Sequence, residues 1–122
     1  MTNQIPTSNE QKPHYDLEER TAKFGEAVLL FCRSLQQDTV TQPLIHQLVR
    51  SATSVGANYM EADAASTKRD FVYKISICRK EAKETRHWLR MISTVLPSAS
   101  SRAAELSRES QELVFIFSAI IR

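Results

Sequence analysis

Apolar residues recur at alternating steps of three and four along most of this chain. Such spacing places one apolar stripe on an α-helix and is typical of helices packed nearly parallel to one another. The pattern is interrupted three times, which predicts four helices. The first two stripes are Leu17, Thr21, Phe24, Val28, Phe31 and Leu35, then Ile45, Leu48, Ala52, Val55, Tyr59 and Ala62. The last two are Phe71, Ile75, Cys78, Ala82, Thr85, Leu89 and Ile92, then Ala103, Leu106, Ser110, Leu113, Phe117 and Ile120.

Local signals predict where these helices begin and end. Asp16 and Thr67 are each followed three residues later by an acidic residue, a pattern that favours a capped helix start. The second helix is expected to begin at residue 41 or 42, and the fourth at residue 100 or 101. Pro97 cannot continue a helix and therefore ends the third.

The predicted loops are short, which favours antiparallel packing of consecutive helices. The sequence therefore predicts an all-α fold, an antiparallel up-down-up-down four-helix bundle, as a single domain over residues 16–122. Residues 1–15 are polar and are expected to form a flexible N-terminal segment.

Composition agrees with a globular helical protein. Apolar residues make up 42% of the chain and charged residues 25%, and there are only two glycines. Cys32 and Cys78 lie far apart and near no histidine pair, so we expect reduced thiols in a cytoplasmic protein. The first 15 residues lack an apolar signal core, and no apolar run approaches a membrane span, so no membrane partner is expected.

Two stretches carry more apolar residues than an isolated bundle needs. Residues 27–32 and 113–121 are apolar around most of the helix, which indicates burial on more than one face. The sequence therefore predicts a subunit interface in a homo-oligomer, and the alternative is a locally thick core. The interface candidates from these stretches are Leu29, Leu30, Phe115 and Ile121.

Candidate catalytic chemistry is sparse. Glu84 and His87 form one E-x-x-H pair, whereas di-iron bundles need two such pairs and two further glutamates. The three histidines share no metal-ligand spacing, and no glycine-rich phosphate loop is present. We therefore expect no enzymatic activity, no catalytic residues, no metal and no cofactor.

Polar residues flank the stripes of the second and third predicted helices. Flanking positions carry hydrogen bonds and salt bridges between helices, so the favoured interpretation is a structural network that fixes helix register. A ligand site is the alternative. The residues concerned are Ser54, Asn58 and Glu61 in the second helix and Lys74, Glu81 and Glu84 in the third.

The third predicted helix is also strongly basic. From Lys68 to Arg90 it holds eight Lys and Arg against three Asp and Glu, a net of +5, whereas the rest of the chain nets −3. Helical spacing aligns several of these cations in one stripe, which resembles a phosphate-binding footprint. A solvated face is the alternative. The candidate nucleic-acid contacts are Lys68, Arg79, Lys83, Arg86 and Arg90.

Two motifs resemble a known family. The second helix matches R-x-A-x-S-I-x-x-N-I-x-E-G at Arg50, Ala52, Ser54, Val55, Asn58, Tyr59 and Glu61. The third matches E-F-x-x-x-L-x-I-A-x-G-S-x-x-E-x-x-x-x-L at Asp70, Phe71, Ile75, Ile77, Glu84 and Leu89. These motifs resemble the four-helix-bundle proteins first noticed inside intervening sequences of bacterial large-subunit ribosomal RNA genes. The chain departs from the family pattern at Ala62 and at the dipeptide 80–81, where the family has glycine and Gly-Ser.

The resemblance implies a compact bundle that assembles as a ring, typically a homopentamer. A related branch, the accessory variability proteins of diversity-generating retroelements, binds nucleic acid and a reverse transcriptase. Our first hypothesis is thus a non-enzymatic scaffold that binds RNA or DNA through its third helix. The second is a protein-interaction adaptor, for example for a reverse transcriptase, with Ile77, Trp88 and Met91 as its contact surface.

Overall fold

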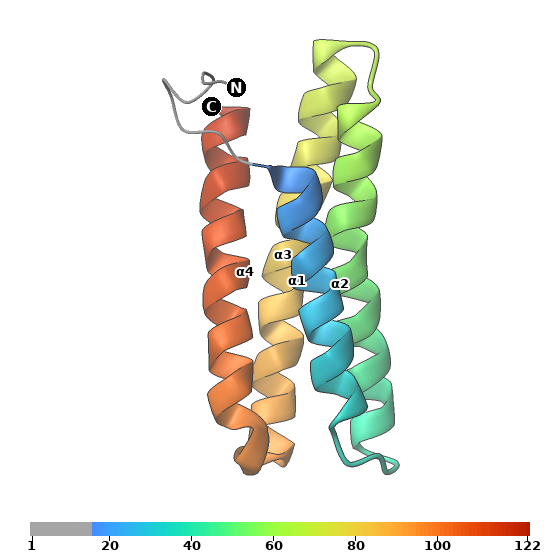
Figure 1. Ribbon diagram of the computed structural model, residues 1–122, viewed down its shortest axis with the longest axis vertical. Helices are drawn as coiled ribbons and strands as arrows, with labels where there is room; N and C mark the ends of the chain where they lie inside the picture. The colour runs from blue at the N-terminus through green and yellow to red at the C-terminus, as the bar shows by residue number, and fades with distance from the viewer. Residues whose placement is uncertain (1–15) are drawn as a thin grey trace, which may run out of the picture.

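The computed structural model describes residues 16–122, and within them it contains four α-helices and no β-strand (Figure 1). The helices are α1 (Leu17–Arg33), α2 (Thr41–Asp63), α3 (Lys68–Val95) and α4 (Ser100–Ile121), with a short 3-10 helix, η2 (Pro97–Ala99), before α4. The predicted all-helical class and the four helices are therefore confirmed over this range. The flexible segment expected at residues 1–15 lies outside the described residues.

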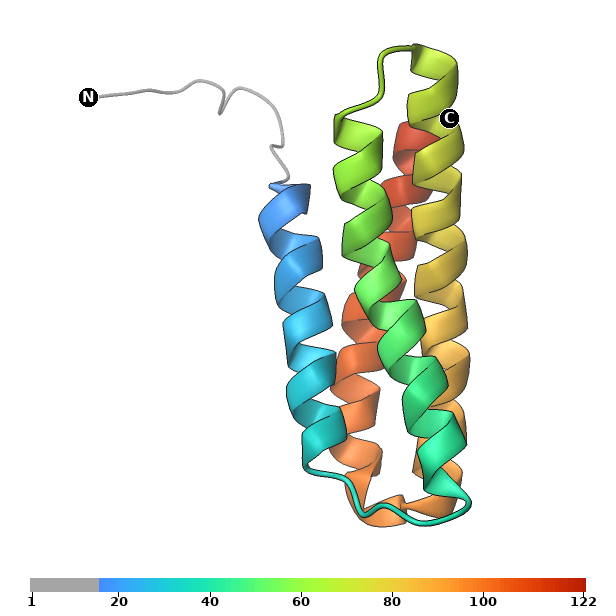
Figure 2. The same cartoon turned by 90° about the vertical axis from the view of Figure 1, so that its right-hand side faces the viewer.

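The chain runs down α1, up α2, down α3 and up α4 in Figure 1, so that each loop joins neighbouring helices. The most extensive contacts are those of α3 with α2 and α4, and among the helix pairs that touch, α1 and α4 have the least extensive contact (Figures 1 and 2). α3 therefore lies between α2 and α4, and the face that it turns away from them is free of helix contacts. None of the helices within residues 16–122 combines the length and the apolar character needed to cross a lipid bilayer.

Helix caps follow the local signals, with one addition. The Asp16 carboxylate accepts the backbone N–H of Glu19, and the Thr67 hydroxyl accepts that of Asp70. α2 begins differently, because Oδ1 of Asp38 accepts the N–H groups of Val40 and Thr41, each at 2.9 Å. These bonds stabilise the carboxylate and lower the pKa of Asp38.

The apolar stripes predicted from spacing form the core. Their members are almost all buried, among them Val28, Leu48, Ile75, Leu89 and Phe117. The apolar spacing carries the first helix on to Leu35, but α1 ends at Arg33, and Leu35 is buried from the loop that follows.

Both cysteine thiols are free and buried, and burial raises the pKa of Cys32 to about 11 and of Cys78 to about 12.

Small polar side chains link α3 to both α2 and α4. The Ser110 hydroxyl of α4 donates to the carbonyl of Ala82 at 2.6 Å, and the Thr85 hydroxyl lies 2.9 Å from that of Ser51 in α2. All four residues are buried, so these bonds satisfy polar atoms that water does not reach. The small side chains allow α2 and α4 to lie close to α3.

Gly25 and Gly56 both lie where α1 meets α2. A Cβ atom at Gly25 would meet its nearest neighbour, the Ala52 carbonyl oxygen, at 3.7 Å, an ordinary contact. We therefore expect Gly25→Ala to raise the free energy of unfolding by about 0.5–1 kcal/mol, because alanine loses less backbone freedom in a helix. Urea denaturation followed by circular dichroism would measure the change.

Gly56→Ala is the matched control for this prediction. Its Cβ would meet the Thr21 hydroxyl at 3.4 Å and the Thr21 backbone at 3.5 Å, so a smaller gain is expected. A loss of stability in Gly25→Ala would mean that α1 and α2 lie closer together than described.

Candidate nucleic-acid interface

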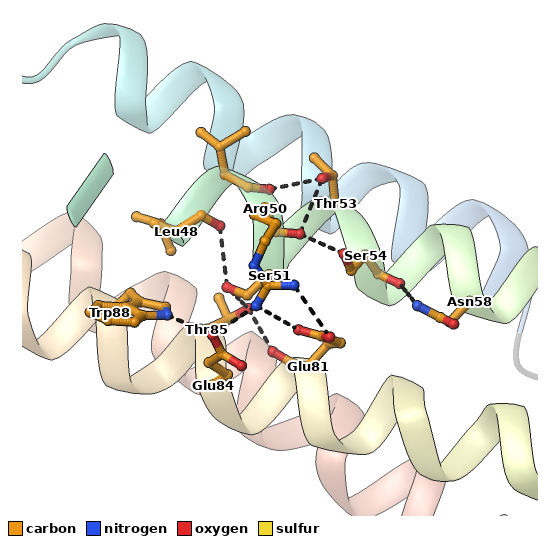
Figure 3. A network of polar contacts seen from close by, with 11 residues as sticks. Leu48, Arg50, Ser51, Thr53, Ser54, Asn58, Glu81, Glu84, Thr85 and Trp88 are labelled. Carbon is orange, nitrogen blue, oxygen red and sulfur yellow. Dashed lines mark hydrogen bonds and ion pairs between the residues drawn. The ribbon is translucent and has the colours of Figure 1, made fainter. Parts of the chain in front are cut away.

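Arg50 of α2 forms ion pairs with two acidic residues of α3, Glu81 and Glu84 (Figure 3). Its Nη2 lies 2.7 Å from Oε2 of Glu84 and 3.2 Å from Oε1 of Glu81. The indole N–H of Trp88 donates to the same Glu84 oxygen at 3.0 Å. This indole bond and the guanidinium hold the pKa of Glu84 below its ordinary value, while the two carboxylates raise the pKa of Arg50. Glu81 and Glu84 therefore face α2, where the Arg50 guanidinium offsets one of their two negative charges.

The rest of the predicted polar network divides into two arrangements. Glu61 and Lys74 form an ion pair that joins α2 to α3. Asn58 instead donates its side-chain amide to the carbonyl of Ser54 at 2.8 Å, and the Ser54 hydroxyl donates to the carbonyl of Arg50 (Figure 3). These last two bonds lie within α2, so Asn58 and Ser54 do not link helices.

The basic stripe lies on the opposite side of α3, toward α4. Lys83, Arg86 and Arg90 are exposed, whereas Arg79 is half-buried and donates to the Ser118 hydroxyl of α4 at 3.3 Å. Lys68 is exposed at the first residue of α3. None of these five cations forms an ion pair with a carboxylate of residues 16–122. Their charges thus remain available for an external anion.

The α4 residues that line a small hollow beside the end of this stripe are uncharged. Arg86 and Arg90 border a hollow of about 190 Å³ whose α4 side is formed by small residues, including Ser100 and Ser107. The acidic residues Glu105 and Glu109 lie elsewhere on α4, beside the α1–α4 hollow, where Glu109 pairs with Arg20 of α1 at 2.8 Å. The only charged residues that line the hollow between α3 and α4 are therefore the cations Arg86 and Arg90.

The residues proposed for a protein contact differ in exposure. Trp88 is half-buried and packs against the core, and Ile77 and Met91 are also only half-exposed. Leu29, Leu30 and Phe115 are exposed, whereas Ile121 is half-buried against the core. Trp88 is thus not the exposed anchor that was expected, and the exposed members of the predicted contact set lie on α1 and α4.

His87 is exposed on α3 next to Trp88, and the two rings pack edge to face with their centroids 4.8 Å apart. Over the range that the structure describes, no group of three or more His, Cys, Asp or Glu side chains is arranged to hold a metal ion. Glu84, the other member of the E-x-x-H pair, is directed to Arg50.

Sequence reasoning missed Arg50, the central residue of the α2–α3 network. Two acids spaced three apart on a flank of α3 that packs against a neighbouring helix favour a cation on that helix. Arg50 lies eleven residues before Glu61, and Glu61 pairs with Lys74. Because α2 and α3 are antiparallel neighbours, a Glu61–Lys74 pair places Arg50 beside residue 85 and therefore near Glu81 and Glu84. This register is the signal that could have identified Arg50.

No curated protein matches the chain. Among solved structures, it is similar to a protein with unknown function from the S23 ribosomal protein family of Bacteroides thetaiotaomicron VPI-5482. The TM-score is 0.77 and the identity 28%, over 87% of this chain and 98% of that chain. The family model described as 23S rRNA-intervening sequence protein matches residues 14–119. Since this match spans nearly the whole chain, the protein belongs to the 23S rRNA-intervening sequence protein family.

Proposed function

We propose that the protein is a non-enzymatic, homo-oligomeric scaffold that binds RNA or DNA through the outer face of α3. The observation that carries the proposal is the separation of charge on this helix. Glu81 and Glu84 are paired with Arg50 on the α2 side, while Lys83, Arg86 and Arg90 remain exposed and unpaired within residues 16–122. An excess of unpaired cations on one helix face attracts polyanions.

The spacing of the cations suits a phosphate backbone. Arg79 and Arg90 are eleven residues apart, which corresponds to about 16 Å along a helix. A stripe of this length can follow several consecutive phosphates. Contacts with phosphates position a nucleic acid without reading its sequence, so binding is expected to depend on charge more than on base order. A ring of subunits, such as a pentamer of up-down bundles, would repeat the stripe and increase avidity.

The adaptor function, for example for a reverse transcriptase, has less support. Its proposed anchor, Trp88, is half-buried and already donates its N–H to Glu84. The exposed apolar side chains on α1 and α4 favour contact between copies of this chain instead, as argued below.

A salt titration tests the proposed function. If single-stranded RNA contacts four cations of the stripe, log Kd should rise with log salt with a slope of about 3, so a fourfold increase in salt weakens binding about 50-fold. Fluorescence anisotropy with a labelled 20-nucleotide RNA would measure this. An uncharged peptide nucleic acid of the same base sequence is the control and should not bind. Equal binding of both probes, or no binding at low salt, would contradict the proposal.

A further inference from the structure

One exposed apolar face lies on α1. Leu29 and Leu30 project from it, and Leu30 is 69% exposed. Beside them, a groove of about 630 Å³ runs between α1 and α2, where Ile45 and Val49 form part of its wall. Glu26 and Arg33 border this groove one helical turn before and after the leucines. We refer to this surface as the α1 groove.

A second exposed apolar face lies on α4. Phe115 projects from it with 59% of its surface exposed. A hollow of about 360 Å³ lies beside the ring, lined also by Ile116, Ala119 and Ile120. Glu112 borders it on the N-terminal side, and Arg122 lies two turns beyond Phe115 on the same face. We refer to this surface as the α4 face.

We propose that the α1 groove of one copy binds the α4 face of a second copy, with the two helices antiparallel and Arg33 beside the second copy's Glu112. This inference rests on the homo-oligomer of the proposed function and identifies the surfaces that join it. Each surface has a projecting apolar side chain next to a hollow, so Phe115 can enter the α1 groove while Leu30 enters the hollow on the α4 face.

Charge selects the antiparallel direction. With Phe115 placed against Leu29 and Leu30, an antiparallel arrangement brings Arg33 level with Glu112 and Glu26 level with the uncharged Ala119. A parallel arrangement would bring Glu26 level with Glu112, which repels it. Glu26, Arg33, Glu112 and Arg122 form no ion pair within residues 16–122, so the external pairing costs no internal bond.

The two surfaces differ and share no residue. In Figure 1, α2 and α4 lie on opposite sides of α1, so one copy can engage two neighbours at once. Contacts between unlike surfaces continue from copy to copy, and they form a ring when the rotation between copies closes and an open filament when it does not. Exposed apolar faces favour aggregation, and this is avoided when every α1 groove is filled by an α4 face.

A charge exchange tests the Arg33–Glu112 contact. Arg33→Glu and Glu112→Arg should each raise the protein concentration at half-dissociation at least about tenfold, because like charges then face each other. The double variant Arg33→Glu/Glu112→Arg should return to within about threefold of the original protein. Light scattering coupled to size-exclusion chromatography over a dilution series would measure the dissociation.

The matched control is Arg33→Glu/Glu105→Arg, which has the same net charge as the exchanged double variant. Glu105 lies two turns from Glu112, beside the hollow between α1 and α4, so this pair of changes should not restore assembly. Restoration by Glu105→Arg, or full assembly of both single variants, would overturn the proposed interface.

A mixing experiment tests whether unlike surfaces meet. Leu30→Glu and Phe115→Glu alter exposed side chains, so both variants should fold, and each alone should be monomeric. A 1:1 mixture should give a two-chain complex through the one intact groove and the one intact α4 face. A mixture that stays monomeric overturns the proposal. Assembly of the original protein is measured first: a monomer contradicts the homo-oligomer itself, whereas an assembly unaffected by both variants contradicts only this interface.

Discussion

Replacing Arg50 with alanine is expected to lower the free energy of unfolding by about 2 kcal/mol. The change removes the cation from Glu81, whose side chain is only 10% exposed, and leaves that carboxylate unpaired. Breaking a fully buried pair costs about 3–5 kcal/mol, and an exposed pair costs less than about 1 kcal/mol. The Arg50 side chain is itself 42% exposed, so an intermediate loss is expected. Urea denaturation followed by circular dichroism would measure it.

Lys74→Ala is the matched control, because it also removes one cation that joins α2 to α3. Its partner Glu61 is exposed and regains water, so the expected loss is clearly smaller than that of Arg50→Ala. Equal losses in the two variants would show that burial of Glu81 adds nothing to the Arg50 pair.

The Arg50 effect should also depend on pH. The Trp88 indole N–H and the Arg50 guanidinium lower the folded-state pKa of Glu84, so this carboxylate stabilises the fold above its unfolded pKa, ordinarily 4.5. That stabilisation is lost as the pH falls through the lower folded-state pKa. The difference in stability between the original protein and Arg50→Ala should therefore shrink in acid. A difference that grows as the pH falls below 4.5 would contradict this linkage.

Local features of the fold could be read from the sequence because their causes lie within a few residues. The Asp16 and Thr67 caps each involve an N–H three residues away, and the buried stripe of α3 follows one uninterrupted period. The end of α1 could not be read in this way. Leu35 continues the apolar spacing, but its burial comes from the loop after the helix.

Features that depend on the relative position of two helices were harder to predict. Periodicity placed Asn58 on the flank that carries interhelical bonds, but its amide reaches only the Ser54 carbonyl of its own helix. Periodicity likewise aligned Arg79 with the basic stripe without showing that Ser118 of α4 is within its reach. A side chain's choice between its own helix, a neighbour and solvent depends on axial register, which one helix alone does not contain.

These placements change which residues best test nucleic-acid binding. Arg79 is half-buried and bonded to Ser118, so reversing its charge would disturb α4 as well as any phosphate contact. Lys83, Arg86 and Arg90 are exposed and unpaired within the described part of the chain, so their reversal should leave the fold intact. They are therefore the cleaner targets.

The triple variant Lys83→Glu/Arg86→Glu/Arg90→Glu is expected to weaken RNA binding at low salt at least about a hundredfold, because it replaces three phosphate contacts with repulsions. The control is Lys23→Glu/Arg102→Glu/Arg108→Glu on α1 and α4. Each reversal lowers the net charge by two, so both variants carry −4 in place of +2. Lys23 and Arg102 form only exposed ion pairs within their own helices, whose loss costs little stability.

Anisotropy titrations with the same labelled RNA would compare the two variants, after circular dichroism has shown that both are folded. If binding depends on the α3 stripe, the α3 variant loses affinity far more than the control does. If it depends only on net charge, the two variants weaken equally, because total charge and the number of changed residues are matched. Equal weakening would therefore contradict the assignment of binding to α3, even if the protein does retain RNA.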